Sequence, residues 1–227
     1  VTPWAYVLNS HYPNNVQWAV YGANGVVAAD RVTDFYAASW PAEAGTPILP
    51  LPNINQALPF TVTTNETQWI NSLRLTGSGT LTLQNDLVIK TGGILVSGTG
   101  AMTIDGATAG RMLFANDFDP SSGDYGDPGE LVISNNQTLD LRVAVSSFGL
   151  TKSGSGTLNL FAYPDTDLGG GALNLLGGAI YVNEPGAIAG AGEINLSGVT
   201  FYPRSNSTGA NTQVLWGNDV NVLYDST

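Results

Sequence analysis

The sequence predicts an all-β protein built as a parallel β-helix (β-solenoid) with an aromatic, proline-rich N-terminal extension. Three observations lead to this fold class: the composition, the many short alternating strands, and a glycine repeat. Only 11% of the 227 residues are charged, against about 25% in average proteins, whereas glycine supplies 28 residues. A chain that is 43% hydrophobic can bury a sizeable core. Helix signals are nearly absent, which favours β-structure with many tight turns.

The first 59 residues differ from the rest in composition: they are rich in aromatic residues and proline. Aromatic-rich stretches at 4–8 and 16–21 have strand character, and the glycines that bound 22–25 indicate a turn. Residues 41–59 contain five prolines, a density that predicts an extended segment over a surface rather than regular interior structure.

From residue 60 the chain consists of short alternating strands separated by glycine turns. Each strand is three to five residues long, which is too short for an independent hairpin. The expected strands are 73–75, 81–83, 87–89, 94–96, 102–104, 131–133, 139–143, 158–160, 173–175, 180–182 and 194–196.

A glycine repeat explains why such short strands are sufficient. The pattern Gly-x-Gly-x-apolar starts at Gly77 and recurs at Gly154, with looser copies at Gly98 and Gly190. Self-similarity on this scale indicates a solenoid, in which one coil cannot bury its apolar face but a stack of coils can. Glycine supplies the corners that need a positive φ.

The segment 149–160, Gly-Leu-Thr-Lys-Ser-Gly-Ser-Gly-Thr-Leu-Asn-Leu, closely resembles the signature of the autotransporter-associated β-strand repeat, also called the passenger-associated transport repeat. The likeness continues through 169–175 and 177–182, but the connecting loop 161–168 departs from the family pattern. Over 60–198 it is weaker. The resemblance implies a right-handed parallel β-helix in a secreted or surface-displayed bacterial protein, and it implies no particular activity.

We therefore expect three parts: an N-terminal cap and extended segment at 1–59, a β-solenoid at 60–198, and a strand-rich extension at 199–227. The last part lacks the glycine repeat, so its strands are candidates to add to a neighbouring copy. No run reaches the roughly 20 apolar residues that a helix needs to span a bilayer. The expected location is extracellular or at the bacterial cell surface.

The acidic stretch 117–130 is the sharpest candidate site. Its acidic and hydroxyl side chains alternate like the first ligands of a calcium loop, although glycine is missing at loop position six and glutamate at position twelve. Three interpretations of this stretch remain open: an irregular Ca²⁺ site, a solvated insertion between coils, and a pair of catalytic carboxylates. The candidate ligands are Asp117, Asp119, Ser121, Asp124, Asp127 and Glu130.

Two smaller features have simpler explanations. Asp165 and Asp167 precede a glycine run and resemble a second calcium turn, but aspartate is common in turns because its side chain bonds to the backbone. His11 is the only histidine, and no Gly-x-Ser-x-Gly elbow accompanies it, so a surface or packed role is expected.

Composition excludes several function classes. With no cysteine, a cysteine-ligated metal site and a thiol nucleophile are impossible. The chain has seven cations against 18 acidic residues, a formal charge of −11, and this balance disfavours nucleic acid as a partner. Polysaccharide hydrolysis would need two facing carboxylates, and the five tryptophans are candidates to stack sugars or to plug an end of the solenoid.

The sequence thus favours a non-enzymatic structural module for surface display, adhesion or self-assembly into a filament or layer. Its expected partners are copies of itself, through the terminal segments, and surface glycans. The competing hypothesis is a carbohydrate-binding or polysaccharide-degrading β-helix protein.

Overall fold

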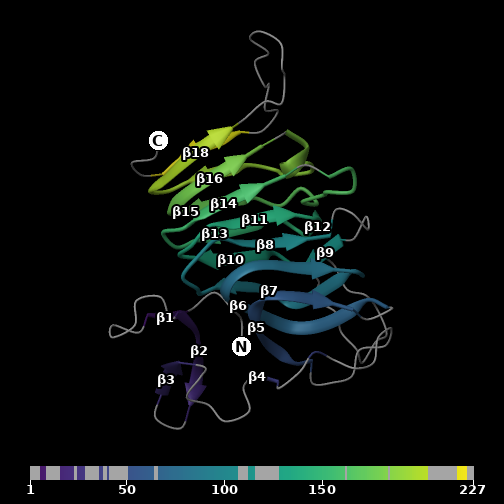
Figure 1. The fold of residues 1–227 in the computed structure, drawn as a ribbon. Helices are drawn as coiled ribbons and strands as arrows, with labels where there is room; N and C mark the ends of the chain where they lie inside the picture. Colours follow the sequence, from purple (N-terminus) through teal and green to yellow (C-terminus); the bar gives the residue numbers. More distant parts are fainter. Residues whose placement is uncertain are drawn as a thin grey trace.

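The computed structural model shows an all-β protein whose parallel strands stack into a β-solenoid of about six turns, which confirms the predicted fold class. Figure 1 shows the strands following one another in chain order, from β5 near the bottom of the stack to β18 near the top. The structure describes residues 6–8, 16–22, 25–28, 36–37, 40, 51–63, 66–106, 112–115, 128–161, 163–183, 185–203 and 219–223.

The solenoid has three faces, which we name A, B and C, because each complete coil contains three strand segments with a turn after each. Strands on each face pair in parallel with the equivalent strands of the coils before and after. Face A contains β4 (Tyr36–Ala37), the first part of β5 (Asn53–Val62), the middle of β6 (Gln68–Leu83), the second half of β7 (Leu87–Val96), β10 (Leu131–Asn135), β13 (Leu150–Ser153), β15 (Leu173–Leu176), β17 (Ile194–Leu196) and β19 (Val220–Val222).

Faces B and C are built in the same way. The long strands β5, β6 and β7 each run across more than one face. Face B contains the ends of β5 and β6, then β8 (Met102–Asp105), β11 (Leu139–Arg142), β14 (Thr157–Leu160), β16 (Gly178–Val182) and β18 (Val199–Pro203). Face C contains the starts of β6 and β7, then β9 (Met112–Ala115) and β12 (Ala144–Ser146), and the short 3-10 helix η3 (Pro185–Ile188) follows β16.

The core is a set of vertical stacks in which one side chain of each coil lies over its counterpart in the next. Alternation along each strand sends every second residue inward, and the pairing register aligns these residues from coil to coil. The inner stack of face A, which we call stack A, comprises Ala37, Ile54, Leu73, Ile94, Ile133, Lys152, Leu175, Leu196 and Val222. On face B the corresponding stack includes Phe60, Leu81, Ile104, Leu141, Leu160 and Val182.

A separate antiparallel sheet forms near the N-terminus. It contains β1 (Tyr6–Leu8), β2 (Val16–Gly22) and β3 (Gly25–Ala28), in that order. Gly22 pairs with Gly25, so the glycines expected to mark a turn join β2 to β3. Strand β2 contacts β7, which places this small sheet against the side of the solenoid.

The proline-rich segment differs from its sequence prediction. Residues 53–59 were expected to lack regular structure, yet they form most of β5 and pair in parallel with β6. Pro59 is accommodated because the register shifts between Leu58 and Phe60, so its missing N–H falls where the ladder is interrupted. The expected boundary at residue 60 therefore lies inside a strand.

The described strands of the C-terminal segment continue the solenoid. Strand β18 pairs with β16 on face B, and β19 pairs with β17 on face A. Within the part of the chain that the structure describes, β18 and β19 are the last strands of their faces. In the same described part, no helix is long and apolar enough to cross a membrane.

Candidate functional site

Most of the acidic candidate site lies outside the described residues. Asp117, Asp119, Ser121, Asp124 and Asp127 belong to that undescribed stretch, so the calcium hypothesis stays a prediction. Glu130 is described: it is exposed, and its carboxylate accepts a hydrogen bond from the Thr151 hydroxyl. Among the residues that are described, no three His, Cys, Asp or Glu side chains gather as a metal site requires.

The calcium hypothesis predicts a stabilisation that a thermal melt can measure. Calcium at about 100 times its Kd should raise the free energy of unfolding by about 2.7 kcal/mol, because the ion binds only the folded chain. A chain carrying both Asp119→Asn and Asp124→Asn should show no such rise, and magnesium should have a smaller effect on the intact chain. A melting temperature that calcium and EDTA both leave unchanged would remove the hypothesis.

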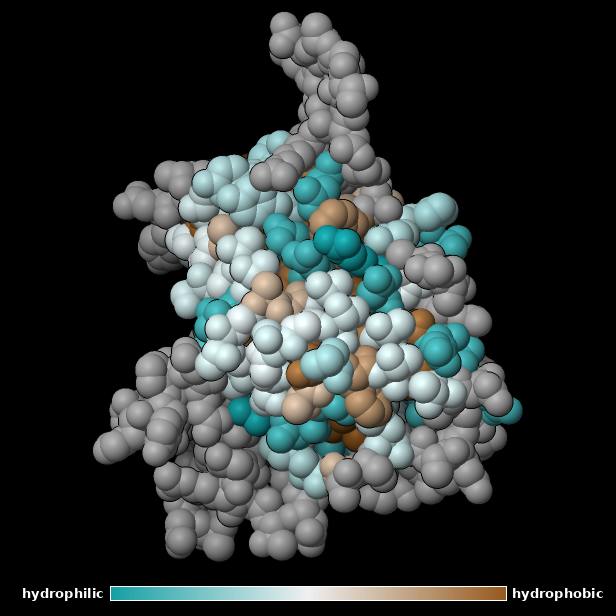
Figure 2. All heavy atoms as spheres, viewed as in Figure 1, coloured by the Kyte–Doolittle hydropathy of each residue, from teal (hydrophilic) through white to brown (hydrophobic). Residues whose placement is uncertain are grey.

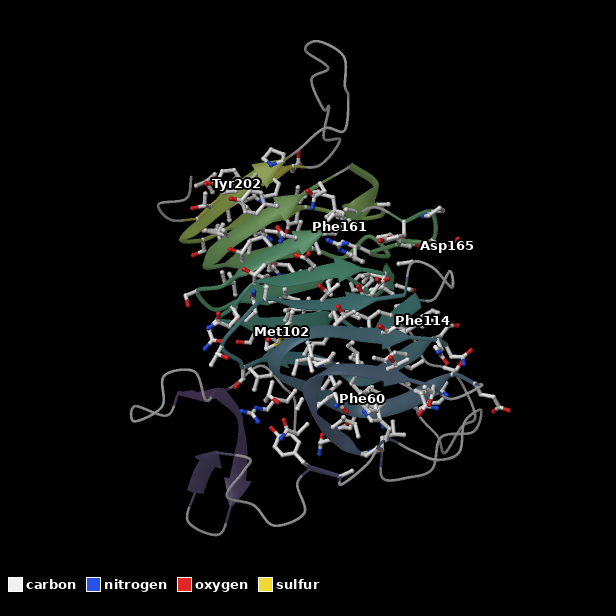
Figure 3. The ribbon with its side chains drawn as sticks, in the orientation of Figure 1. Phe60, Met102, Phe114, Phe161, Asp165 and Tyr202 are labelled. Atoms are coloured by element: carbon white, nitrogen blue, oxygen red, sulfur yellow. The ribbon has the colours of Figure 1, made fainter. Side chains whose placement is uncertain are left out.

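In the second acidic turn, residues 165–167, side chains form hydrogen bonds with backbone N–H groups. The Asp167 carboxylate accepts a hydrogen bond from the Gly169 N–H at 2.9 Å, as expected for an aspartate in a turn. Thr166, between the two aspartates, is buried, and its hydroxyl accepts a bond from the Val145 N–H at 3.4 Å. Asp165 is exposed at the outer edge of the stack (Figure 3). These contacts give Asp167 and Thr166 backbone-binding roles in the turn.

The described tryptophans have different surroundings. Trp40 stacks on Phe60, with ring centroids 6.0 Å apart, and its Nε1 donates to Gln56 at 2.7 Å. It packs against the core near the first coil, where a cap was expected. Trp69 points outward on face C into a small apolar cluster with Leu51, Val88 and Phe114. The side chains of Trp4, Trp18 and Trp216, together with His11, are outside the described set.

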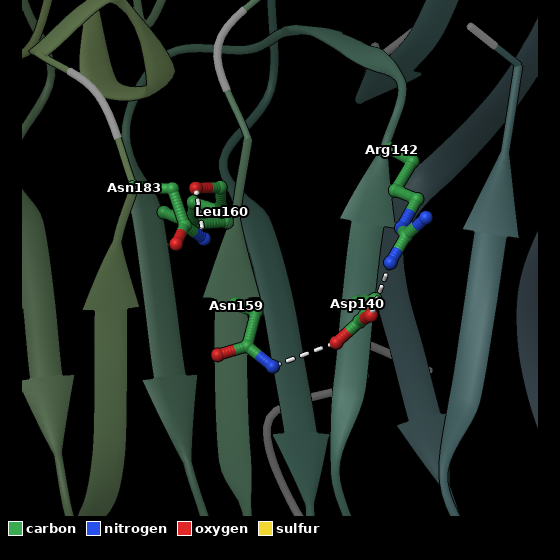
Figure 4. Close-up of polar contacts among 5 residues, drawn as sticks. All are labelled: Asp140, Arg142, Asn159, Leu160 and Asn183. Carbon is green, nitrogen blue, oxygen red and sulfur yellow. Dashed lines mark hydrogen bonds and ion pairs between the residues drawn. The ribbon is translucent and has the colours of Figure 1, made fainter. Parts of the chain in front are cut away.

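Face B carries polar and aromatic groups on its outer surface. Asn159 donates to Asp140 at 2.6 Å, and Arg142 forms an ion pair with the same carboxylate at 3.2 Å (Figure 4). In the coils above, the Tyr181 and Tyr202 rings stack with centroids 4.3 Å apart. Figure 2 shows this side of the solenoid as mostly neutral to hydrophilic, with only separated apolar spots.

No family model, no curated protein and no solved structure matches this chain.

Face A carries a continuous ladder of hydrogen bonds on its outer surface, which we call the Asn ladder. Its members, Thr151, Asn174, Asn195 and Asn221, occupy the same register position in successive coils. The Asn174 amide donates to Thr151 at 3.1 Å, Asn195 donates to Asn174 at 2.9 Å, and Asn221 donates to Asn195 at 2.9 Å. Every amide thus donates toward the preceding coil, which gives the ladder a direction.

Glu193 reinforces the upper part of the ladder. Its two carboxylate oxygens accept hydrogen bonds of 3.2 Å from the amides of Asn195 and Asn221. Both amide hydrogens of Asn221 are thereby directed toward preceding residues, and its Oδ1 has no hydrogen bond from another described residue. The C-terminal end of the ladder is an acceptor.

Lys152 occupies an apolar position of stack A, between Ile133 and Leu175. It is fully buried, and its Nζ donates to the carbonyl oxygens of Gly154 and Gly177, both at 2.7 Å. These glycines belong to corners of successive coils, so the ammonium group links one coil to the next. Burial lowers the pKa of Lys152 from 10.5 to about 8, because the charged form loses its hydration.

Sequence reasoning missed both Lys152 and the Asn ladder as functional elements. The sequence nevertheless contains a pattern that indicates each of them. Lys152 has the same parity as Leu150 in its strand, and strict alternation places both side chains inside. The triplets 173–175, 194–196 and 220–222 share an apolar-Asn-apolar pattern, which predicts an amide ladder once the coils are stacked in register.

Proposed function

We propose that this chain is a non-enzymatic, extracellular structural module of a bacterial surface protein: a rigid β-solenoid used for surface display, adhesion or self-assembly. The observation that carries the proposal is the continuously buried interior of the stack. From Ile54 to Leu196, the side chains of stack A are at most 7% exposed, including that of Lys152. Such an interior makes the solenoid long and stiff, because the same side-chain stacking repeats from coil to coil.

Two further observations support this proposal. The segment 149–160 resembles the autotransporter-associated repeat, and that resemblance favours a secreted or surface-displayed bacterial protein. The outer surfaces of faces A and B use Asn, Thr and Asp side chains that bond to one another between coils. Polar groups used in this way contribute to cohesion along the axis.

The alternative is a carbohydrate-binding or polysaccharide-degrading protein. The observation that favours it is the row on face B, where Asp140, Arg142 and Asn159 lie below the stacked Tyr181 and Tyr202. Aromatic rings next to planar polar groups are the usual components of a sugar-binding surface.

A glycan array and turnover assays on acidic and neutral polysaccharides separate the two functions. The structural proposal predicts no turnover by the intact chain, and any glycan binding should survive Asp119→Asn and Asp124→Asn. Turnover that these changes abolish would replace the proposal with the enzymatic alternative. Glycan binding that Tyr202→Ala abolishes, while Phe148→Ala leaves it intact, would favour a carbohydrate-binding module.

A further inference from the structure

The last coil exposes two inward positions of face A, those of Val220 and Val222, whose counterparts from β10 to β17 are buried. In stack A the exposed fraction rises from 0% at Leu175 to 7% at Leu196 and 63% at Val222. Val220, the other inward residue of β19, is 49% exposed. Nearby, Tyr202 on the outer surface of β18 and Leu223 after β19 add apolar surface, at 42% and 55% exposed. The described end of the solenoid is therefore an apolar edge of the kind that pairs with further strands.

The direction of the Asn ladder selects how such an edge can pair. Asn221 presents a carbonyl oxygen, because its amide hydrogens are directed to the preceding coil. Two such ends facing each other would place acceptor against acceptor, which disfavours a head-to-head contact. A strand that follows in the parallel sense, as each coil follows the one before, meets no such conflict.

The opposite end of the same face offers a continuation in register. Asn53 occupies the ladder position in β5, where its Oδ1 accepts bonds of 2.7 Å from Asn71 and Ser72, residues of the following coil. Acceptors thus face the C-terminal end here too. Stack A begins at Ala37 in β4, the described strand that lies outside β5, and it ends at Val222. Figure 1 shows β4 and β18 at opposite ends of the molecule.

We infer that a second copy of this chain stacks on the first head to tail, with its β4 pairing in parallel with β19 so that Ala37 of one copy follows Val222 of the other in a single continuous stack. This deepens the proposed function, on which it rests, by naming the partner, the two edges and their direction. Because the two edges differ, the contact is heterologous and repeats into an open filament.

Disulfide trapping tests the inference directly, because the chain contains no cysteine to interfere. Copies carrying Val222→Cys are mixed with copies carrying Ala37→Cys at physiological salt. Parallel neighbours in a sheet lie within the Cα separation that a disulfide bridges, so the mixed disulfide should dominate. As a matched control, Val222→Cys mixed with Phe148→Cys should give no excess of mixed product, although Phe148 is 55% exposed.

Sedimentation velocity of the cysteine-free chain gives the second readout. The mass should grow with concentration beyond a dimer, and Val222→Lys should raise the concentration needed by at least about tenfold, since a lysine would enter the apolar contact. Phe148→Lys should behave like the unchanged chain. Three results would overturn the inference. In the trapping experiment, this is a Val222→Cys homodimer as the main product. In sedimentation, it is a species that stops at the dimer or a strictly monomeric chain. Glycan turnover would instead refute the proposed function, so the two failures are distinguishable.

Discussion

Replacing Gly154 with alanine should lower the free energy of unfolding by about 2–5 kcal/mol. Gly154 has a φ of +85°, a conformation that costs other residues about 1–2 kcal/mol. An added Cβ would also lie 2.4 Å from the backbone carbonyl oxygen of Asn135 in the preceding coil. The two coils would have to separate at this corner, and overpacking of this kind costs about 1–3 kcal/mol more.

A matched control separates the two causes. Gly170 has a similar φ of +81°, but a Cβ added there meets nothing within 4 Å. Gly170→Ala should therefore cost only about 1–2 kcal/mol, the conformational part alone. Urea unfolding of both variants measures the difference. Equal losses in the two variants would mean that the coils are not stacked as closely as the structure requires.

Replacing Lys152 with alanine should lower the free energy of unfolding by about 3–5 kcal/mol. The change removes a long buried side chain from stack A, and comparable truncations of Met or Leu cost about 2–5 kcal/mol. It also removes the donor shared by the carbonyls of Gly154 and Gly177. As a surface control, Lys90→Ala should change stability by less than about 0.5 kcal/mol, because Lys90 is partly exposed.

The lowered pKa of Lys152 also predicts a dependence of stability on pH. Between pH 8 and 10.5 the unfolded chain keeps the proton that the folded chain has lost, so stability rises with pH across this range. The full difference corresponds to roughly 3 kcal/mol. Lys152→Met keeps the length of the side chain without a titrating group. The unfolding free energy of the unchanged chain, minus that of Lys152→Met, should rise over this range; a flat difference would contradict the buried ammonium.

Strand positions were largely predictable because they depend on local alternation. Leu139, Leu173 and Ile194 each begin an apolar-polar-apolar triplet, and each begins a strand of the solenoid. Gly77 and Gly154 of the repeat have positive φ values of 80° and 85°, as expected for corners. These features require no knowledge of which strands are neighbours.

Features that depend on neighbouring coils were less predictable. Burial of Lys152 requires two carbonyls from different corners, which only the stacked coils bring together. The strand at Asn53–Val62 forms despite its proline because β6 supplies the pairing that local propensity opposes. Propensity and composition describe each segment by itself, whereas these outcomes follow from inter-coil contacts.

Distances between spin labels along face B test the stacked arrangement most directly. Thr80, Thr103, Asp140, Asn159, Tyr181 and Tyr202 follow one another in register on its outer surface. Cysteine pairs are introduced into the cysteine-free chain as Thr80→Cys with Asn159→Cys, Tyr181→Cys or Tyr202→Cys.

With about 4.8 Å between neighbouring strands, pulsed electron resonance should give backbone separations of roughly 14, 19 and 24 Å for these three pairs. The separation should thus grow by one strand spacing for each coil. Separations that fail to increase in this order, or whose increments differ clearly from one strand spacing, would contradict the solenoid account.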